Sequence, residues 1–185
     1  PNDSRLAAAS EDGSVKVWDS ISGEELLSLP RLSGLWDIAF LSNGRIVTAG
    51  QDGVARVWDS DTGGEVLTLA GHKSTIVGVA GSPDGTRIAT SGYDETVRVW
   101  DATPSHETLT IQAHQDVVWD VQYSPDGKRL ASVSVDGTAK LWDSQSGQLL
   151  LTLPKGNVYT DQFTGLAFSP DGAKLATGTM DGIIT

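Results

Sequence analysis

Cysteine, long apolar runs and helical periodicity are all missing from this 185-residue sequence. The absence of cysteine excludes disulfide bonds, thiol catalysis and cysteine-ligated zinc sites. No apolar run approaches the roughly 18 residues that a membrane helix needs, and residues 1–10 lack the basic start and apolar core of a signal peptide. These features predict an all-β protein that resides in the cytoplasm and contacts no membrane.

Basic residues are also scarce, because 13 Lys and Arg stand against 24 Asp and Glu and the net charge is −11. Half of the acidic residues recur at fixed positions of short turn motifs, so much of the acidity belongs to the architecture. A nucleic-acid backbone site needs a basic stripe, and we therefore expect no nucleic-acid partner. With three histidines, of which His106 is expected to be solvated on a rim, we also expect no metal site and no cofactor.

The sequence is organised by an internal repeat. The pair Trp-Asp begins at residues 18, 58, 100 and 142, which gives spacings of 40, 42 and 42 residues. A second motif, Ser-Pro-Asp-Gly, keeps the same phase at 82–85, 124–127 and 169–172, with a weaker Leu-Ser-Asn-Gly version at 41–44. Two motifs that share one period indicate a repeat architecture.

Each repeat divides into short apolar segments that are separated by turns. In one repeat the segments VVWDVQYS, KRLASVS, TAKLW and QLLLTL are separated by PDG, VDG and DSQSG. The segments are rich in β-branched and aromatic residues, whereas the turns consist of Gly, Asp, Pro and Ser. We therefore expect four antiparallel strands in each repeat, named a to d in chain order.

On these motifs the sequence resembles the WD40 family of β-propellers, in which each repeat is a four-stranded blade. The segments SPDGKRLAS and DGTAKLWD are similar to those of bacterial WD40 arrays. The resemblance implies an all-β propeller with about four and a half blades in an incomplete ring. The expected repeats are 1–30 without strand a, 31–70, 71–112, 113–153 and a truncated 154–185.

Two repeats carry the same set of polar residues at offsets of 18, 4 and 6 positions. The sets are His72, Thr90, Asp94 and Trp100, then His114, Ser132, Asp136 and Trp142. A hydroxyl, a histidine and an aspartate would also suit a catalytic triad, but a catalytic site is not expected to recur in successive repeats. The resemblance implies that each set is a buried hydrogen-bonded chain, since buried polar groups are costly unless paired.

The other repeats depart from this set. Arg31 aligns with the histidine of its repeat, Ala8 replaces the hydroxyl of the first, and Thr177 and Asp181 lack an aligned histidine in the last. We expect these blades to be less rigid than the two complete ones. The Asp that follows each repeated Trp is expected to cap the c–d turn.

The resemblance also implies that partners bind on the top face of the propeller. The contacts would come from two positions on strand a and from the residue before the b–c turn Asp. The candidate binding residues are Trp36, Gln51, Val77, Tyr93, Val117, Trp119 and Val135. Because Trp and Tyr are enriched at interface hot spots, we expect a protein or peptide partner, and packing against neighbouring blades is the alternative.

The function that this pattern favours is a non-catalytic protein-interaction scaffold or sensor module, with a signalling role by analogy to WD40 arrays. One alternative is self-assembly, in which the incomplete ring closes with another copy, as a homo-oligomer, or with the remainder of a longer propeller. A second alternative is an enzyme that uses the propeller channel, for which Asp37 and Asp120 are the candidate acids.

Overall fold

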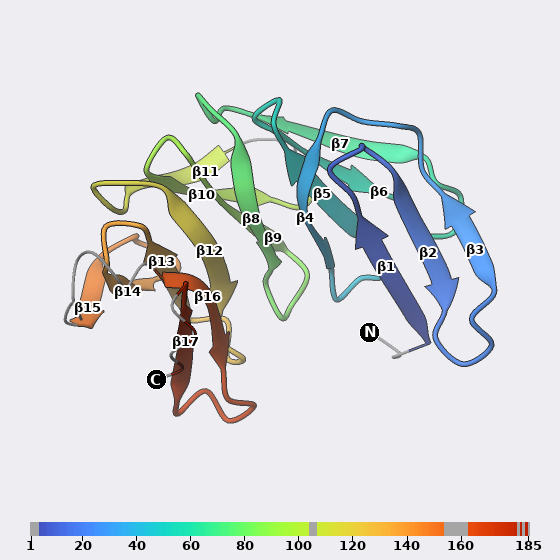
Figure 1. Cartoon of the computed structure of the whole chain (residues 1–185). Helices are drawn as coiled ribbons and strands as arrows, with labels where there is room; N and C mark the ends of the chain where they lie inside the picture. The colour runs from blue at the N-terminus through green and yellow to red at the C-terminus, as the bar shows by residue number, and fades with distance from the viewer. Residues whose placement is uncertain (1–3, 104–106, 154–162, 181, 183, 185) are drawn as a thin grey trace.

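A computed structural model describes residues 4–103, 107–153, 163–180, 182 and 184. These residues form seventeen strands and no helix, arranged in five antiparallel sheets (Figure 1). His106, expected on the rim, and Asp181, expected in the last b–c turn, lie outside the described residues. The sheets follow one another along the chain, and each is called a blade below.

Blades 2, 3 and 4 have four strands each, in the chain order a to d. Blade 2 contains β4 (Leu35–Phe40), β5 (Ile46–Gly50), β6 (Val54–Trp58) and β7 (Glu65–Ala70). Blade 3 contains β8 (Ile76–Gly81), β9 (Arg87–Gly92), β10 (Thr96–Asp101) and β11 (Glu107–Gln112). Blade 4 contains β12 (Val118–Tyr123), β13 (Arg129–Ser134), β14 (Ala139–Asp143) and β15 (Leu149–Leu153).

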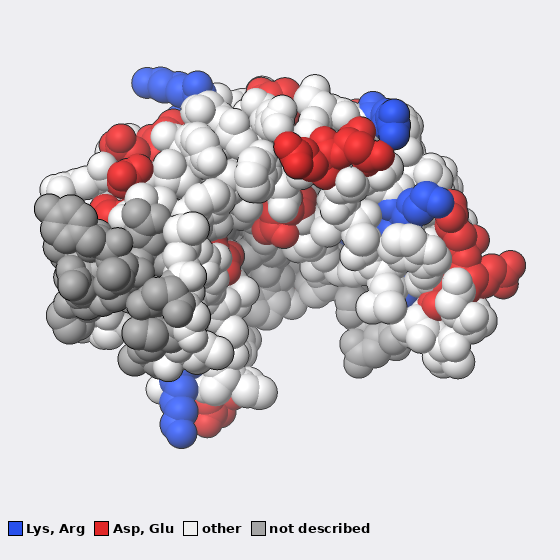
Figure 2. Space-filling view, viewed as in Figure 1, with Lys and Arg blue, Asp and Glu red and all other residues white. Residues whose placement is uncertain are grey.

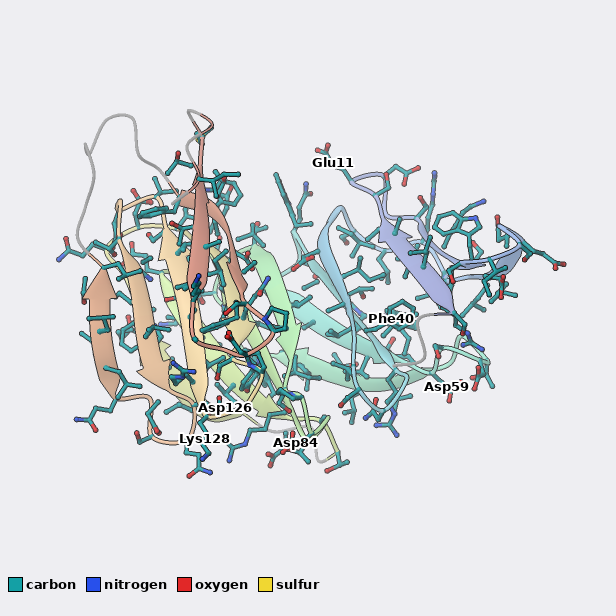
Figure 3. All side chains as sticks on the ribbon, turned by 90° about the horizontal axis from the view of Figure 1, so that it is seen from below. Glu11, Phe40, Asp59, Asp84, Asp126 and Lys128 are labelled. Atoms are coloured by element: carbon teal, nitrogen blue, oxygen red, sulfur yellow. The ribbon has the colours of Figure 1, made fainter. Side chains whose placement is uncertain are left out.

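The two outer blades are shorter. In the described part of the chain, blade 1 has strands b, c and d, which are β1 (Arg5–Ala9), β2 (Val15–Asp19) and β3 (Glu25–Ser28). Blade 5 has, among the described residues, strands a and b, which are β16 (Phe163–Phe168) and β17 (Leu175–Thr179), and an isolated bridge between Gly178 and Ile184. The five blades form an arc that does not close into a ring, and β4, β8, β12 and β16 line its inner side (Figures 1 and 3). The expected fold class, an all-β incomplete propeller, is confirmed.

The hydrophobic core lies between neighbouring blades. One cluster joins Val17 of blade 1 to Ile46 of blade 2, and similar clusters fill the three following interfaces. Strands β5, β9 and β13 are buried along almost their whole length because a blade covers each of their faces. In contrast, β1 alternates between half-buried and exposed residues, as expected for a sheet with one covered face.

Aspartates fix the turns between strands. The c–d turn aspartates Asp19, Asp59 and Asp143 each accept two backbone N–H bonds, for example from Asp61 and Thr62 to Asp59 Oδ1 at 3.0 and 2.8 Å. The predicted capping role is therefore confirmed at three of the four Trp-Asp pairs, while the turn after Asp101 runs into residues 104–106, outside the described part.

Candidate functional site

The first polar set is a continuous chain of hydrogen bonds inside blade 3. Trp100 Nε1 donates to Thr90 Oγ1 at 2.9 Å, and His72 Nε2 lies 2.7 Å from the same oxygen. His72 Nδ1 lies 2.9 Å from Asp94 Oδ1. Since a carboxylate only accepts, Nδ1 carries the proton and Nε2 accepts from the Thr90 hydroxyl. Burial alone would raise the pKa of Asp94, but the bonds from His72 and the Lys73 N–H outweigh it and hold that pKa well below its usual range.

The second polar set repeats this arrangement in blade 4. Trp142 Nε1 donates to Ser132 Oγ at 2.9 Å, His114 Nε2 lies 2.8 Å from that oxygen, and His114 Nδ1 lies 3.1 Å from Asp136 Oδ2. Burial lowers the pKa of His114 to about 4, so its imidazole is neutral at pH 7. Ser132 is 0% exposed, so no substrate reaches its hydroxyl, and the set has the geometry of a structural clamp.

Blade 2 forms only part of such a set. Trp58 Nε1 donates to Thr48 Oγ1 at 2.9 Å. Arg31, which aligns with the histidine of the complete sets, does not join the set of blade 2, because it pairs with Asp12 of blade 1 at 2.9 Å. Asp52 pairs instead with Arg56 at 2.7 Å. A guanidinium is costly to bury, and Arg31 remains at the surface.

Three predicted binding residues from three different blades meet in one cluster, which we call the aromatic patch: Trp36, Tyr93 and Trp119. The Trp119 ring lies in the middle, 6.2 Å from the Trp36 ring and 6.0 Å from the Tyr93 ring between centroids, with an edge-on contact to Tyr93. Trp36 and Tyr93 are 45% and 41% exposed. These distances and angles are typical of stabilising aromatic pairs.

The other predicted binding residues surround this patch in different ways. Gln51 is exposed and lies against the Gly34 backbone, where an added Cβ would come within 2.8 Å of its amide. Val117 and Val135 are half-buried and are joined by a backbone bond of 3.0 Å from Val135 N–H. Val77 is only 7% exposed and lines the inner hollow described next, so its role in partner binding stays a prediction.

An inner hollow of about 410 Å³ adjoins the aromatic patch on the inner side of the arc. Its walls include Trp36 and Trp119 together with Asp37, Asp120 and Val77. The two aspartates occupy equivalent places on β4 and β12, each at a bulge in its strand pairing. At the equivalent places of β8 and β16 the residues are Gly78 and Gly165, so carboxylates occur in alternate blades only.

Both carboxylates bridge neighbouring blades. Asp37 Oδ2 accepts from the Val79 N–H at 2.8 Å, and Asp120 Oδ2 accepts from the Leu166 N–H at 3.0 Å. Burial raises the pKa of Asp37. Burial also raises the pKa of Asp120 to about 6, and the negative charge of Asp37 contributes to this increase. The hollow therefore holds two carboxylates whose charges are only partly compensated.

Arginines at the start of strand b form a second type of bridge that the repeat analysis did not predict. Arg5 donates to the Ser60 carbonyl at 2.9 Å, Arg45 to the Ala102 carbonyl at 3.3 Å, and Arg87 to the Ser144 carbonyl at 3.1 Å. In each case the arginine reaches the c–d turn of the next blade. The recurrence of Arg in this phase of the repeat was the signal in the sequence.

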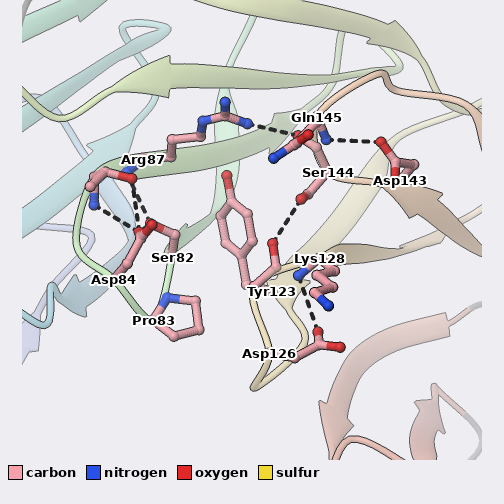
Figure 4. A pocket seen from close by; sticks show the side chains of 12 residues that line it. Ser82, Pro83, Asp84, Arg87, Tyr123, Asp126, Lys128, Asp143, Ser144 and Gln145 are labelled. Atoms are coloured by element: carbon pink, nitrogen blue, oxygen red, sulfur yellow. Dashed lines mark hydrogen bonds between the residues drawn. The ribbon is translucent and has the colours of Figure 1, made fainter.

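A lower pocket of about 530 Å³ surrounds the Arg87 bridge between blades 3 and 4 (Figure 4). Its acids Asp84, Asp126 and Asp143 each accept hydrogen bonds within their own turns. Tyr123 is 8% exposed, and its hydroxyl has no hydrogen-bond partner among the described residues.

Among all described residues of the chain, no group of three or more His, Cys, Asp or Glu residues is placed to hold a metal ion.

Comparison with known families gives two matches. Residues 34–185 match the model described as the first β-propeller of IFT122, and residues 1–19 match the model described as WD domain, G-beta repeat. Because the first match covers well over half of the chain, the chain belongs to the WD40-repeat β-propeller family. A search of curated proteins found no match. In general, propellers of this family are non-catalytic scaffolds for protein interaction. No helix in the described residues is long and apolar enough to cross a membrane.

Proposed function

We propose that this propeller segment is a non-catalytic scaffold or sensor module that binds a peptide segment of a partner protein at the aromatic patch. The observation that carries the proposal is the meeting of Trp36, Tyr93 and Trp119 from three separate blades, with two of the rings more than 40% exposed. Large aromatic rings that remain in water do not stabilise the fold. In protein interfaces, however, Trp and Tyr are the residues that most often dominate the binding energy.

The surroundings of the patch support a peptide rather than a small substrate. The patch adjoins a wall formed by the a strands, in which Asp37 and Asp120 each accept a hydrogen bond from the neighbouring blade. The polar groups that would form a catalytic set are closed inside the blades, and Ser132 has no exposed surface. We therefore propose no catalytic step for Asp37 and Asp120. A cytoplasmic location and a role in signalling follow from the family resemblance and are part of the proposal.

The experiment is selection of binding peptides from a displayed random library against the chain, followed by affinity measurements on variants. We expect Trp36→Ala and Trp119→Ala each to weaken the selected peptides at least about tenfold, because hot-spot aromatics contribute about 2 kcal/mol or more. The matched control is Leu150→Ala, which removes an exposed apolar side chain from the outer strand β15. Peptides that bind all three variants as tightly as the parent chain would contradict the proposal.

A second candidate function, assembly, has its own observation. Among the described residues blade 1 has no strand a, and Leu6 of β1, which lies on the face of the sheet that blade 2 does not cover, is 60% exposed. A strand from a second copy, or from the remainder of a longer propeller, would pair with the free edge of β1, and a neighbouring blade of that copy or remainder would cover Leu6. Light-scattering mass after size exclusion tests self-pairing. A dimer that is lost in Leu6→Lys supports it, and a monomer at high concentration contradicts it.

A further inference from the structure

The inner hollow has an unusual balance of charge. Asp37 and Asp120 lie in its wall, and no lysine or arginine is among the described residues that line it. Figure 2 shows acidic side chains near the middle of this view of the arc, and both acidic and basic side chains around its periphery. The charge that would complement the two carboxylates is therefore absent from the described residues that line the hollow.

The tryptophan rings beside the two carboxylates also favour a positively charged ligand. Trp36 and Trp119 line the same hollow as the carboxylates, and the faces of indole rings attract cations. Each bridging oxygen already accepts one backbone N–H bond, and a carboxylate has about four acceptor sites. Both aspartates can therefore accept further hydrogen bonds from a ligand without losing their bridges.

We infer that the inner hollow is the pocket for a cationic side chain, lysine or arginine, of the peptide segment bound at the aromatic patch. This inference rests on the proposed function and names the chemistry of its partner. The peptide covers Trp36 and Tyr93, and one ammonium or guanidinium group enters between the carboxylates of Asp37 and Asp120. A volume of about 410 Å³ is sufficient for such a side chain.

Other occupants fit less well. Ca²⁺ prefers six to eight oxygen ligands, and the hollow offers two carboxylates that are already bonded to backbone N–H groups. An anion would meet two negative charges with no cation beside it in the described wall. A neutral apolar side chain would remove more water from both carboxylates without supplying a positive charge, which is unfavourable. A cationic side chain is the one class that uses the acids and the rings together.

The direct test is a titration of the isotopically labelled chain with isolated amino-acid probes. The probes are Nα-acetyl-lysine methylamide, its arginine counterpart, and the Nζ-acetylated lysine derivative, which has the same shape near the backbone but no charge. The readout is the NMR shift of the Trp36 and Trp119 indole N–H signals, assigned with single Trp→Phe variants. We expect saturable shifts with the two cationic probes and none with the acetylated probe.

Variants locate the binding charge. Asp37→Asn and Asp120→Asn retain an oxygen that accepts the Val79 or Leu166 N–H, so the bridges and the fold persist. We expect the double variant to bind the cationic probes about tenfold more weakly, which corresponds to 1.4 kcal/mol. The control is Asp84→Asn on the lower side, since Asn43 already fills the equivalent turn position of blade 2 and accepts the Arg45 N–H at 3.1 Å. Equal binding by all variants, or no shift with any cationic probe, would overturn the inference.

The selected peptides separate this inference from the proposed function. If peptides require Trp36 and Trp119 but tolerate acetylation of every lysine and both Asp→Asn changes, the aromatic patch binds peptides and the cation pocket is wrong. If selection yields no peptide that depends on the two tryptophans, the proposed function fails and the probe titration alone decides on the pocket. If acetylation and the double variant both abolish binding, the inference is supported.

Discussion

Blades 2 and 3 have the same strands and the same turns, yet the hydrogen-bonded chain that begins at the buried tryptophan differs between them. In blade 3 the indole, a hydroxyl, His72 and Asp94 form one chain, in which the Asp94 side chain is 7% exposed. In blade 2 the chain stops at Thr48, and Asp52, with a side chain 26% exposed, pairs with Arg56 near the surface. The aspartate of the same turn motif can therefore belong to a buried hydrogen-bonded chain in one blade and to a surface ion pair in the next.

The largest difference between the two blades is expected when the turn aspartate of each is removed. We expect Asp94→Ala to lower the free energy of unfolding by about 3 kcal/mol, because His72 and the Lys73 N–H lose a buried partner. Asp52→Ala should cost less than about 1 kcal/mol, as for other exposed ion pairs. Urea unfolding of both variants provides the measurement, and equal losses would show that the two aspartates play the same role.

A smaller difference is expected at the hydroxyl between the indole and the histidine. Thr90→Val leaves both Trp100 Nε1 and His72 Nε2 without a partner, so we expect a loss of about 2 kcal/mol. Thr48→Val leaves only the Trp58 indole unsatisfied, and the loss should be about 1 kcal/mol. Thermal unfolding of the two isosteric variants measures this, and a larger loss at Thr48 would contradict the account.

How far these differences could be predicted from the sequence depends on the residue. The complete sets were visible as identical offsets, and the aromatic cluster was visible because Trp36 and Trp119 are additional to the repeated tryptophans. The pairing of Arg31 with Asp12 was not predictable, because alignment gives a residue's position but not the direction in which a long side chain extends. The bridges of Asp37 and Asp120 depend on the distance between neighbouring blades, and the sequence of a single repeat carries no information about that distance.

The inner hollow should differ from the buried polar sets of blades 3 and 4 in how its contribution to stability depends on pH. The pKa of Asp120 is about 6 in the folded chain and about 4 when unfolded, so its ionisation opposes folding progressively from pH 4 to 6 and fully above that range. Asp120→Asn should therefore stabilise the chain by about 1–2 kcal/mol at pH 8 and have no effect near pH 4. The charged group that faces Asp120 in the described wall is Asp37. Urea unfolding of parent and variant at both pH values tests this, and stabilisation that is equal at both would contradict it.

The smallest predicted effect concerns Tyr123, which has Phe40 and Phe168 as its counterparts at the ends of β4 and β16. Because its buried hydroxyl lacks a partner among the described residues, Tyr123→Phe should stabilise the chain by a few tenths up to about 1 kcal/mol. Leu130→Ala in the same core cluster is the destabilising control. A clear loss of stability in Tyr123→Phe would show that the hydroxyl has a bound partner in solution.

Hydrogen exchange of the four repeated tryptophans tests the difference between complete and incomplete blades most directly. The indole N–H groups of Trp100 and Trp142 donate to hydroxyls that histidine also contacts, whereas Trp58 has the hydroxyl alone and Ala8 provides none in blade 1. We predict that Trp100 and Trp142 exchange only through global unfolding, Trp58 faster, and Trp18 fastest by about a hundredfold or more. Equal protection of all four indoles would contradict the claim that the polar sets determine the rigidity of each blade.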